Sequence, residues 1–258
     1  METYIKDKIA ATGTAEKSWK SSQGDILDLA LTDPDYGSEA STSELVDQLK
    51  TFFFAGHDTT ASTISWSYYF LSHNPSALAS LRAELDAVFG AGTSPADVAK
   101  QLNADSKLHT KLDYTLSVIK ESLRLEPPAA PAREAPANYS IHTSTGFTVV
   151  PPQGTMVYTS AWMLHRNPRV WGEDSNEYRP ERFMSGNPIP WGYLAFSKRP
   201  RDCIGSTLAY LEAKIILALT ARHFDFEPTI EFYRVLKGTV WTFLTGTDVS
   251  KNRVRKHR

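Results

Sequence analysis

The chain's only cysteine, Cys203, lies in the segment FSKRPRDCIG, residues 196–205. Lysine and two arginines precede it, and a long stretch with helical patterning follows Gly205. The free N–H groups and dipole at a helix N-terminus stabilise an anion, and nearby arginines act in the same direction. Asp202 opposes them. On balance these residues favour a thiolate at Cys203, which is either a nucleophile or a metal ligand.

The nucleophile, zinc and haem interpretations of Cys203 make different demands on the sequence. A nucleophile needs a partner base, and none of the seven histidines lies near Cys203 in sequence. A zinc site needs more ligands than one cysteine without a C-x-x-C motif or a close histidine pair. The remaining chemistry for a lone thiolate is to be the single axial ligand of a haem iron. Because lone cysteines are most often inert and buried, that alternative stays open.

A second candidate site lies in AGHDTT, residues 55–60, between the apolar stretches FFF and ISWSYYF. Burying the carboxylate of Asp58 there is costly unless it is paired or used. The Thr59 hydroxyl can turn onto the carbonyl of Ala55 and open the helix locally, and Gly56 leaves space beside it. An acid next to an alcohol in such a place is a plausible proton relay. The alternative is that Asp58 faces solvent.

Two further stretches carry charged residues at notable spacings. Glu121 and Arg124 lie three apart and therefore on neighbouring helix positions. They are either a surface ion pair, because they lie away from the apolar stripe of residues 112–123, or a buried structural pair, because a second apolar patch adjoins Glu121. Arg182, in YRPERF, reads by itself as a solvated loop arginine.

The elements that must position these residues are predicted to be mainly helical, with a little sheet. Thr42 or Ser43 can cap a helix that ends at Asn74-Pro75, with an apolar middle that predicts burial. The other expected elements are helices over 75–90, 111–125, the short SAWMLHRNP and 206–224 (apolar stripe Leu208, Leu211, Ile215, Leu219), two strands around the turn PPQG, and strands at FDFE and TVWTFLTG.

Composition narrows the class of protein. With 41% hydrophobic residues the chain can bury a core, and 28 basic against 29 acidic residues give no global field for nucleic acid. One cysteine excludes a disulfide framework and indicates a reducing compartment. No apolar run of membrane-spanning length and no signal peptide are present. We expect residues 1–41 to be a polar N-terminal segment and residues 42–258 to form one folded part.

Taken together and in this order, AGHDTT, ESLR (121–124), PERF (180–183) and FSKRPRDCIG resemble the cytochrome P450 family, the haem-thiolate monooxygenases. The resemblance covers residues 41–227, about the C-terminal half of a usual member, and is greatest to eukaryotic, fungal-type microsomal members. It implies the C-terminal portion of the P450 fold, mainly α with small β-sheet elements. Residues 42–258 would be the haem-binding half, and secondary metabolism would be the setting.

The resemblance also implies a cofactor, partners and roles. The cofactor would be haem b, and the partners a NADPH-cytochrome P450 reductase type electron donor and a small apolar substrate, with no nucleic acid. The endoplasmic reticulum membrane would be contacted through an N-terminal anchor absent from this chain. Cys203 would be the axial thiolate, with Phe196 packed beneath it. Arg201 and Arg133 would pair with the haem propionates, and Asp58 and Thr59 would deliver protons. Glu121, Arg124 and Arg182 would form a buried structural triad.

Two departures from the family pattern set up a second hypothesis. Arg199 stands where the family has a glycine in the ligand loop, and a left-handed backbone at an arginine costs roughly 1–2 kcal/mol. By the resemblance, the family's N-terminal half would be missing, including a tryptophan and arginine that clamp a propionate, and Trp19 has no arginine at the right offset. The chain is therefore either part of a monooxygenase or a truncated, non-catalytic remnant with weak or no haem binding.

Overall fold

The computed structural model describes residues 3–4, 7, 26–28, 42–143, 145–184, 191–198, 200–227 and 253–256. The chain divides into two compact units, Met1–Asp58 and Thr59–Arg258. The described part is mainly helical with small two-stranded sheets, which confirms the predicted fold class. Most of residues 1–41 lie outside the described residues, so the expected boundary at 41/42 stays a prediction.

The long helix α3 covers Thr42–His73, as predicted, and continues through the boundary between the units. It ends where expected because Pro75 disfavours helical backbone at Asn74, whose side-chain amide donates to the Phe70 carbonyl at 2.7 Å. The expected burial of its middle is wrong for residues 51–58, where Phe53 and Phe54 are 66% and 69% exposed. Apolar patterning shows that a helix can be buried, but packing neighbours decide whether it is.

Three helices follow α3 and form much of the core. Helix α4 covers Pro75–Phe89 and ends at Gly90, which has φ 89°, as its proline and glycine signals predicted. Helix α5, Pro95–Ala104, begins at a Ser94 cap and was not predicted. The short 3-10 helix η1 takes up Leu108–Lys111, so α6 begins at Asp113, two residues later than expected, and runs to Leu125. Helix α6 is buried on nearly all sides, in contact with α4 among others.

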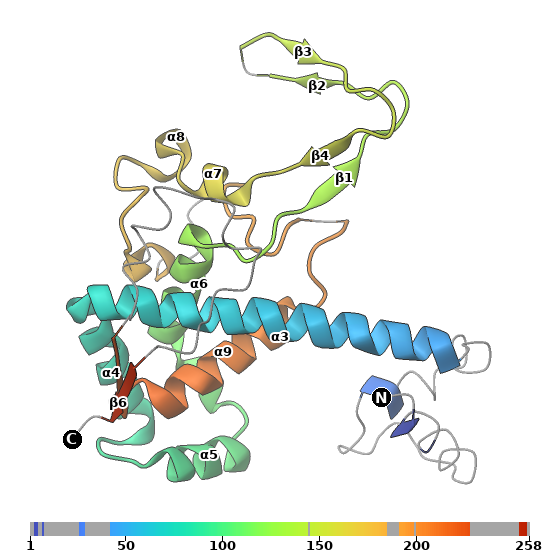
Figure 1. Cartoon of the computed structure of the whole chain (residues 1–258). Coiled ribbons are helices and arrows are strands. Elements are labelled where there is room, and N and C mark those ends of the chain that lie inside the picture. Colours follow the sequence, from blue (N-terminus) through green and yellow to red (C-terminus); the bar gives the residue numbers. More distant parts are fainter. Residues whose placement is uncertain are drawn as a thin grey trace. The chain divides into compact units, whose positions relative to one another are not determined.

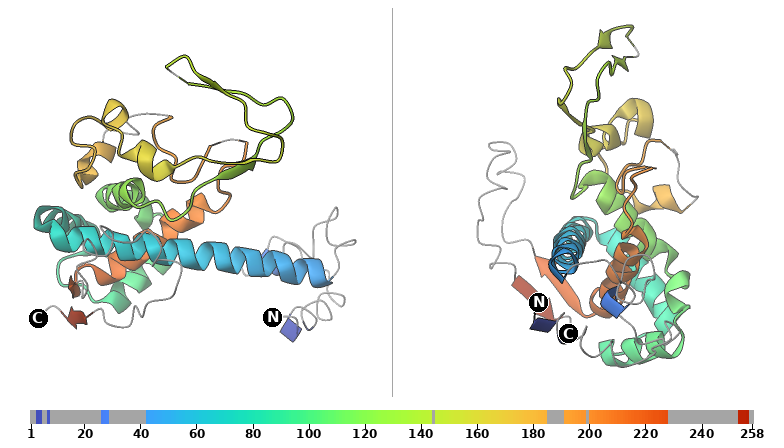
Figure 2. Two further views of the ribbon diagram at one scale, coloured as in Figure 1. Left: turned by 45° about the horizontal axis from the view of Figure 1, so that its top comes forward. Right: turned by 90° about the vertical axis from the view of Figure 1, so that its right-hand side faces the viewer.

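The two strands predicted around PPQG are present, as β3 (Thr148–Val149) and β4 (Met156–Tyr158), and each has a partner earlier in the chain. β1 (Ala132–Glu134) pairs antiparallel with β4, and β2 (Ile141–His142) pairs with β3. The strands on either side of PPQG, β3 and β4, therefore pair with earlier strands and not with each other. Figures 1 and 2 show the β1–β4 ladder reaching away from the helices, with β2 and β3 at its far end. Local patterning predicted β3 and β4 but not β1 and β2, and the pairing of the strands depends on segments elsewhere in the chain.

The C-terminal part of the described chain supplies the remaining elements. These are α7 (Ala161–His165), α8 (Pro168–Trp171), the 3-10 helix η2 (Pro180–Phe183), α9 (Ser206–Thr220) and the antiparallel pair β5 (Phe224–Glu227) and β6 (Arg253–Lys256). The helix in SAWMLHRNP and the strand at FDFE are confirmed, whereas TVWTFLTG lies outside the described residues.

Helix α9 contacts α5, α6 and η1 with a face that is shifted from the one its sequence indicated. Leu208 is 60% exposed, and the buried residues are Ala213, Lys214, Leu217 and Ala218. The predicted stripe is only partly buried: Leu211, Ile215 and Leu219 are half-buried. The closest packing comes from Leu217, two alanines and the aliphatic part of Lys214. Among the described residues, no helix combines the length and apolar character that crossing a membrane requires.

Candidate functional site

Glu121 and Arg124 form a buried ion pair near the C-terminal end of α6. Both side chains are 0% exposed, so the pair is not a surface pair. The Arg124 Nε donates to Glu121 Oε2 at 2.7 Å, and Nη2 donates to Oε1 at 2.8 Å. This two-point geometry is the strong form of an arginine–carboxylate interaction. A charge pair removed from water needs such a geometry to offset the loss of hydration.

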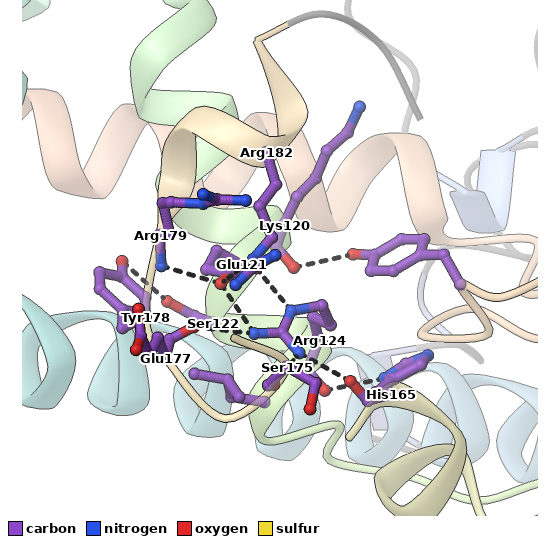
Figure 3. Close-up of polar contacts among 12 residues, drawn as sticks. Lys120, Glu121, Ser122, Arg124, His165, Ser175, Glu177, Tyr178, Arg179 and Arg182 are labelled. Atoms are coloured by element: carbon purple, nitrogen blue, oxygen red, sulfur yellow. Dashed lines mark hydrogen bonds and ion pairs between the residues drawn. The ribbon is translucent and has the colours of Figure 1, made fainter. Parts of the chain in front are cut away.

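The rest of the Arg124 guanidinium binds backbone carbonyls from the loops that cover α6 (Figure 3). Nη1 donates to the carbonyls of His165 and Ser175, both at 2.6 Å, and Nη2 donates to that of Glu177 at 3.0 Å. The indole ring of Trp171 lies under the guanidinium carbon at 5.1 Å. Arg124 therefore fixes three separate points of the chain between residues 165 and 177 onto one helix.

Arg182 joins the same carboxylate from η2. Its Nε lies 3.2 Å from Glu121 Oε1, and the Arg179 backbone N–H donates to the same oxygen at 2.9 Å. Arg182 also pairs with Asp174, and this hydrogen bond lowers the pKa of the Asp174 carboxyl. The structure thus brings Glu121, Arg124 and Arg182 together. The interpretation of Arg182 as a solvated loop arginine is wrong. Its side chain is only 4% exposed because η2 packs directly on α6.

A cavity of about 270 Å³ in the second unit gathers most of the other candidate residues. Its wall includes Cys203, Arg201, Arg133, Phe196 and Thr59. Apolar side chains of α6, Ile119 and Leu123, complete part of the lining. Small-molecule sites typically measure about 300–1,000 Å³ and combine an apolar wall with a few polar groups. The composition fits that pattern, and the volume is just below it.

Cys203 lies in the loop before α9 and lines this cavity. The residue is exposed, and its backbone N–H donates to the Phe196 carbonyl at 2.9 Å. Its carbonyl accepts from the Ser206 N–H at 3.3 Å, which connects it to the first turn of α9. The inert, buried cysteine is therefore excluded, and the thiol remains accessible for chemistry.

The loop between Phe196 and Cys203 contains a strained position. Ser197 has φ 62°, in the left-handed region, and its N–H donates to the Leu194 carbonyl at 3.0 Å. A non-glycine residue in this region costs of order 1–3 kcal/mol and persists only where the surrounding structure enforces it. Arg199, the residue in place of the family's glycine, lies outside the described residues. The left-handed residue in the described part of this loop is thus Ser197, two residues before Arg199 in sequence.

The two candidate arginines and Phe196 reach the cavity from different elements. Arg133 lies on β1, paired with Val157 of β4, and Arg201 lies in the loop before Cys203; both are exposed. Neither forms an ion pair with a carboxylate among the described residues. Phe196 is half-buried, with its ring edge-on to Tyr210 of α9 at 4.9 Å. Two exposed guanidinium groups at one cavity suit a ligand with carboxylates.

The predicted proton relay on α3 is only partly brought to the cavity. Thr59 is half-buried at the wall, and Thr60 and Thr63 join it there, both buried. Asp58 belongs to the first unit; its carboxylate is 60% exposed and lies 2.9 Å from His57 Nδ1. Helix α3 is continuous α-helix throughout, so the expected local opening is not observed.

Sequence reasoning missed four residues that shape this region. Thr60 and Thr63 repeat at a spacing of three, which places both on one helix face and was a usable signal. His165 was noted only as part of a short helix. Glu84 on α4 binds the start of α6, and no local pattern indicates a cap thirty residues away in sequence.

Comparison with known proteins identifies the family. The family model described as cytochrome P450 matches residues 2–239. The cytochrome P450 monooxygenase acrF of Aspergillus aculeatus is 35% identical over 209 residues, which cover 73% of this chain and 42% of that protein. Human cytochrome P450 4V2 is 39% identical over 208 residues (79% and 36%), and a cytokinin hydroxylase of Arabidopsis thaliana is 35% identical over 204 residues (78% and 37%). The chain belongs to the cytochrome P450 family.

The chain spans about two fifths of the length of these curated relatives. The resemblance drawn from four short motifs is thus confirmed at the level of the family, in fungal, animal and plant members. Members of this family are haem-thiolate proteins that work with a redox partner.

Proposed function

We propose that this chain carries the haem-binding part of a haem-thiolate monooxygenase. The observation that carries the proposal is the single cavity wall that holds Cys203, Arg133, Arg201 and Thr59. These residues fit haem b: a sulfur for the iron, guanidinium groups for the two propionates, and apolar side chains for the macrocycle. Phe196 would pack beneath the iron ligand, since its carbonyl binds the Cys203 N–H.

The expected reaction inserts one atom of dioxygen into a C–H bond of an apolar substrate. The second oxygen atom leaves as water, which requires two electrons and two protons for each turnover. Haem held by a thiolate supplies the activation of dioxygen, because the sulfur donates electron density that favours O–O cleavage. The Thr59 hydroxyl, at the cavity wall, can accept one proton and donate another. Asp58, the residue before Thr59 on α3, would supply the proton that the hydroxyl accepts.

The partners and location follow from the family. Two electrons would come from a NADPH-cytochrome P450 reductase type donor, and the substrate would be a small apolar molecule. By analogy with eukaryotic relatives, the site of action would be the cytosolic face of the endoplasmic reticulum membrane. The roles of Glu121, Arg124 and Arg182 would be structural, because all three are buried and bound to one another.

A second candidate function, a non-catalytic P450 remnant with weak or no haem binding, is favoured by exposure around the ligand. Cys203 is exposed and the next residue, Ile204, is 91% exposed. The protein shell around a metal site controls solvent access and the redox potential of the metal, and an exposed Cys203 would leave a bound iron without that control.

Haem reconstitution of the full chain separates the two candidates. The purified chain would be mixed with haemin, reduced under carbon monoxide and examined by absorption spectroscopy. We expect a red-shifted Soret band, which reports thiolate ligation, and we expect Cys203→Ser to abolish it. Arg133→Gln and Arg201→Gln should weaken haem binding, whereas Arg169→Gln, at an exposed position away from the cavity, is the matched control.

Two outcomes would count against the monooxygenase. A red-shifted band that persists in Cys203→Ser would exclude Cys203 as the ligand. Absence of the band in the unsubstituted chain would favour the remnant, and Arg199→Gly would then identify the cause. Recovery of the band would attribute the failure to the arginine in the ligand loop, and continued absence would attribute it to the rest of the chain.

A further inference from the structure

His165, the last residue of α7, is completely buried between two backbone groups. Its Nδ1 lies 2.8 Å from the Arg124 carbonyl oxygen, and its Nε2 lies 2.8 Å from the Leu194 backbone nitrogen. A carbonyl only accepts hydrogen bonds and a backbone N–H only donates them. The ring must therefore be neutral, with its proton on Nδ1, and each nitrogen has a fixed task.

Packing holds the imidazole plane in place. The ring of Tyr193 stacks on it at 5.4 Å with an interplanar angle of 15°, and Trp171 meets it edge-on at 6.1 Å. The Tyr193 hydroxyl donates to the Lys120 carbonyl of α6 at 3.2 Å, which fixes the stacking partner in turn. The imidazole therefore has little freedom to follow Leu194 if that residue moves.

The two hydrogen bonds of His165 connect the buried ion pairs to the cavity wall. On one side, Arg124 binds Glu121 and also donates back to the His165 carbonyl (Figure 3). On the other side, Leu194 begins a turn, and its carbonyl accepts from the Ser197 N–H. The Phe196 carbonyl accepts from the Cys203 N–H. Residues 194–197 and Cys203 all line the cavity.

We propose that His165 is a positioning residue for the segment that runs from Leu194 to Cys203, which it anchors to the Glu121–Arg124 pair. The buried pair is a rigid reference point, because its charges cannot move without losing their partners. His165 is the direct link between that reference and the segment, through the Leu194 N–H. The importance of this placement for catalysis rests on the proposed function of Cys203, whereas the anchoring itself does not.

Asparagine and glutamine separate the two hydrogen bonds of His165. In His165→Asn the side-chain amide lies where Nδ1 was, so donation to the Arg124 carbonyl is kept and the acceptor for Leu194 is lost. In His165→Gln the longer side chain reaches the position of Nε2, so its oxygen can accept from the Leu194 N–H. His142→Asn changes an exposed histidine on β2 and is the matched control.

Amide hydrogen exchange of the full chain without haem, followed by NMR, gives the decisive readout. We expect His165→Asn to accelerate exchange at Leu194 and Cys203 by about tenfold or more, the factor that corresponds to one lost buried hydrogen bond. His165→Gln should restore most of the protection. The core amides of Leu81 and Leu85 on α4 should be unchanged in both variants, and the amides of Leu194 and Cys203 should be unchanged in His142→Asn.

Two results would overturn the inference. One is unchanged exchange at Leu194 in His165→Asn; the other is equal acceleration at Leu194 and in α4 in both variants, which a general loss of stability would produce. Haem reconstitution adds an independent readout. We expect a smaller red-shifted Soret band in His165→Asn than in His165→Gln. If no form of the chain shows that band, the proposed function fails while hydrogen exchange still decides the inference.

Discussion

Among single residues, Glu121 and Arg124 show how burial changes the meaning of an ion pair. On a helix surface such a pair contributes at most about 1 kcal/mol. Here both side chains are 0% exposed, and Arg124 also donates to three backbone carbonyls. Removal of Glu121 would leave the Arg124 charge buried without a carboxylate, which typically costs about 3–5 kcal/mol, whereas removal of Arg124 would leave Glu121 paired with Arg182 alone. The pair therefore holds the loops around α6 in place.

His165 predicts a pH dependence of folding. Burial lowers the pKa of its imidazole to about 4; its hydrogen bond to the Arg124 carbonyl opposes the shift, and the charges of Arg124 and Arg166 add to it. In the unfolded chain the pKa is near 6.5. Between about pH 6.5 and 4 the unfolded state binds a proton that the folded state does not, so stability falls as pH falls. The full loss is about 3 kcal/mol.

Urea unfolding at pH 7 and pH 4 would measure this loss. Because carboxylates also titrate in that range, the parent chain must be compared with His165→Gln, which has no imidazole to protonate. We expect the parent to lose more stability than the variant by about 3 kcal/mol. An equal loss in both would show that His165 does not titrate with a lowered pKa.

Among the elements, α6 depends on a cap supplied by another helix. Its first residues are Asp113, Tyr114 and Thr115, and Leu112 before them provides no side-chain cap. Glu84 of α4 accepts instead from the Tyr114 N–H at 2.6 Å, from the Thr115 N–H at 2.9 Å and from the Thr115 hydroxyl at 2.6 Å. A carboxylate at this end also interacts favourably with the helix dipole.

We predict that Glu84→Gln lowers the free energy of unfolding by about 1–2 kcal/mol, because the amide has one acceptor oxygen and no charge. Glu212→Gln, at an exposed position on α9, should change it by less than about 0.5 kcal/mol. Thermal or urea denaturation of both variants provides the comparison. Similar values for the two would mean that Glu84 does not act as the cap of α6.

For the molecule as a whole, haem binding should appear as stabilisation. A ligand that binds only the folded state stabilises it in proportion to RT ln(1 + [L]/Kd), which is about 2.7 kcal/mol at a hundredfold excess over Kd. For a chain of this size that corresponds to a rise in Tm of roughly 5–10 °C. Differential scanning calorimetry with increasing haemin should show this rise, and Cys203→Ser should show a smaller one. A Tm independent of haemin concentration would argue against a specific site.

Local signals in the sequence were sufficient for the principal helices. Asn74-Pro75 and Gly90 set the ends of α3 and α4 where they were expected, because backbone restrictions of proline and the left-handed freedom of glycine act within one turn. Four motifs in a fixed order were sufficient for the family, and that prediction is confirmed. The roles of the individual site residues stay predictions.

Only the tertiary structure decided which surfaces meet. It buried Glu121 and Arg124, exposed Phe53 and Phe54, and gave β3 and β4 partners other than each other. It also gave His165 its two backbone partners, from residues 41 positions earlier and 29 positions later in the chain. Periodicity reports that a side chain is apolar or charged, but its burial and partners depend on segments far away in sequence. Such contacts form only when the whole chain has packed, so no local pattern encodes them.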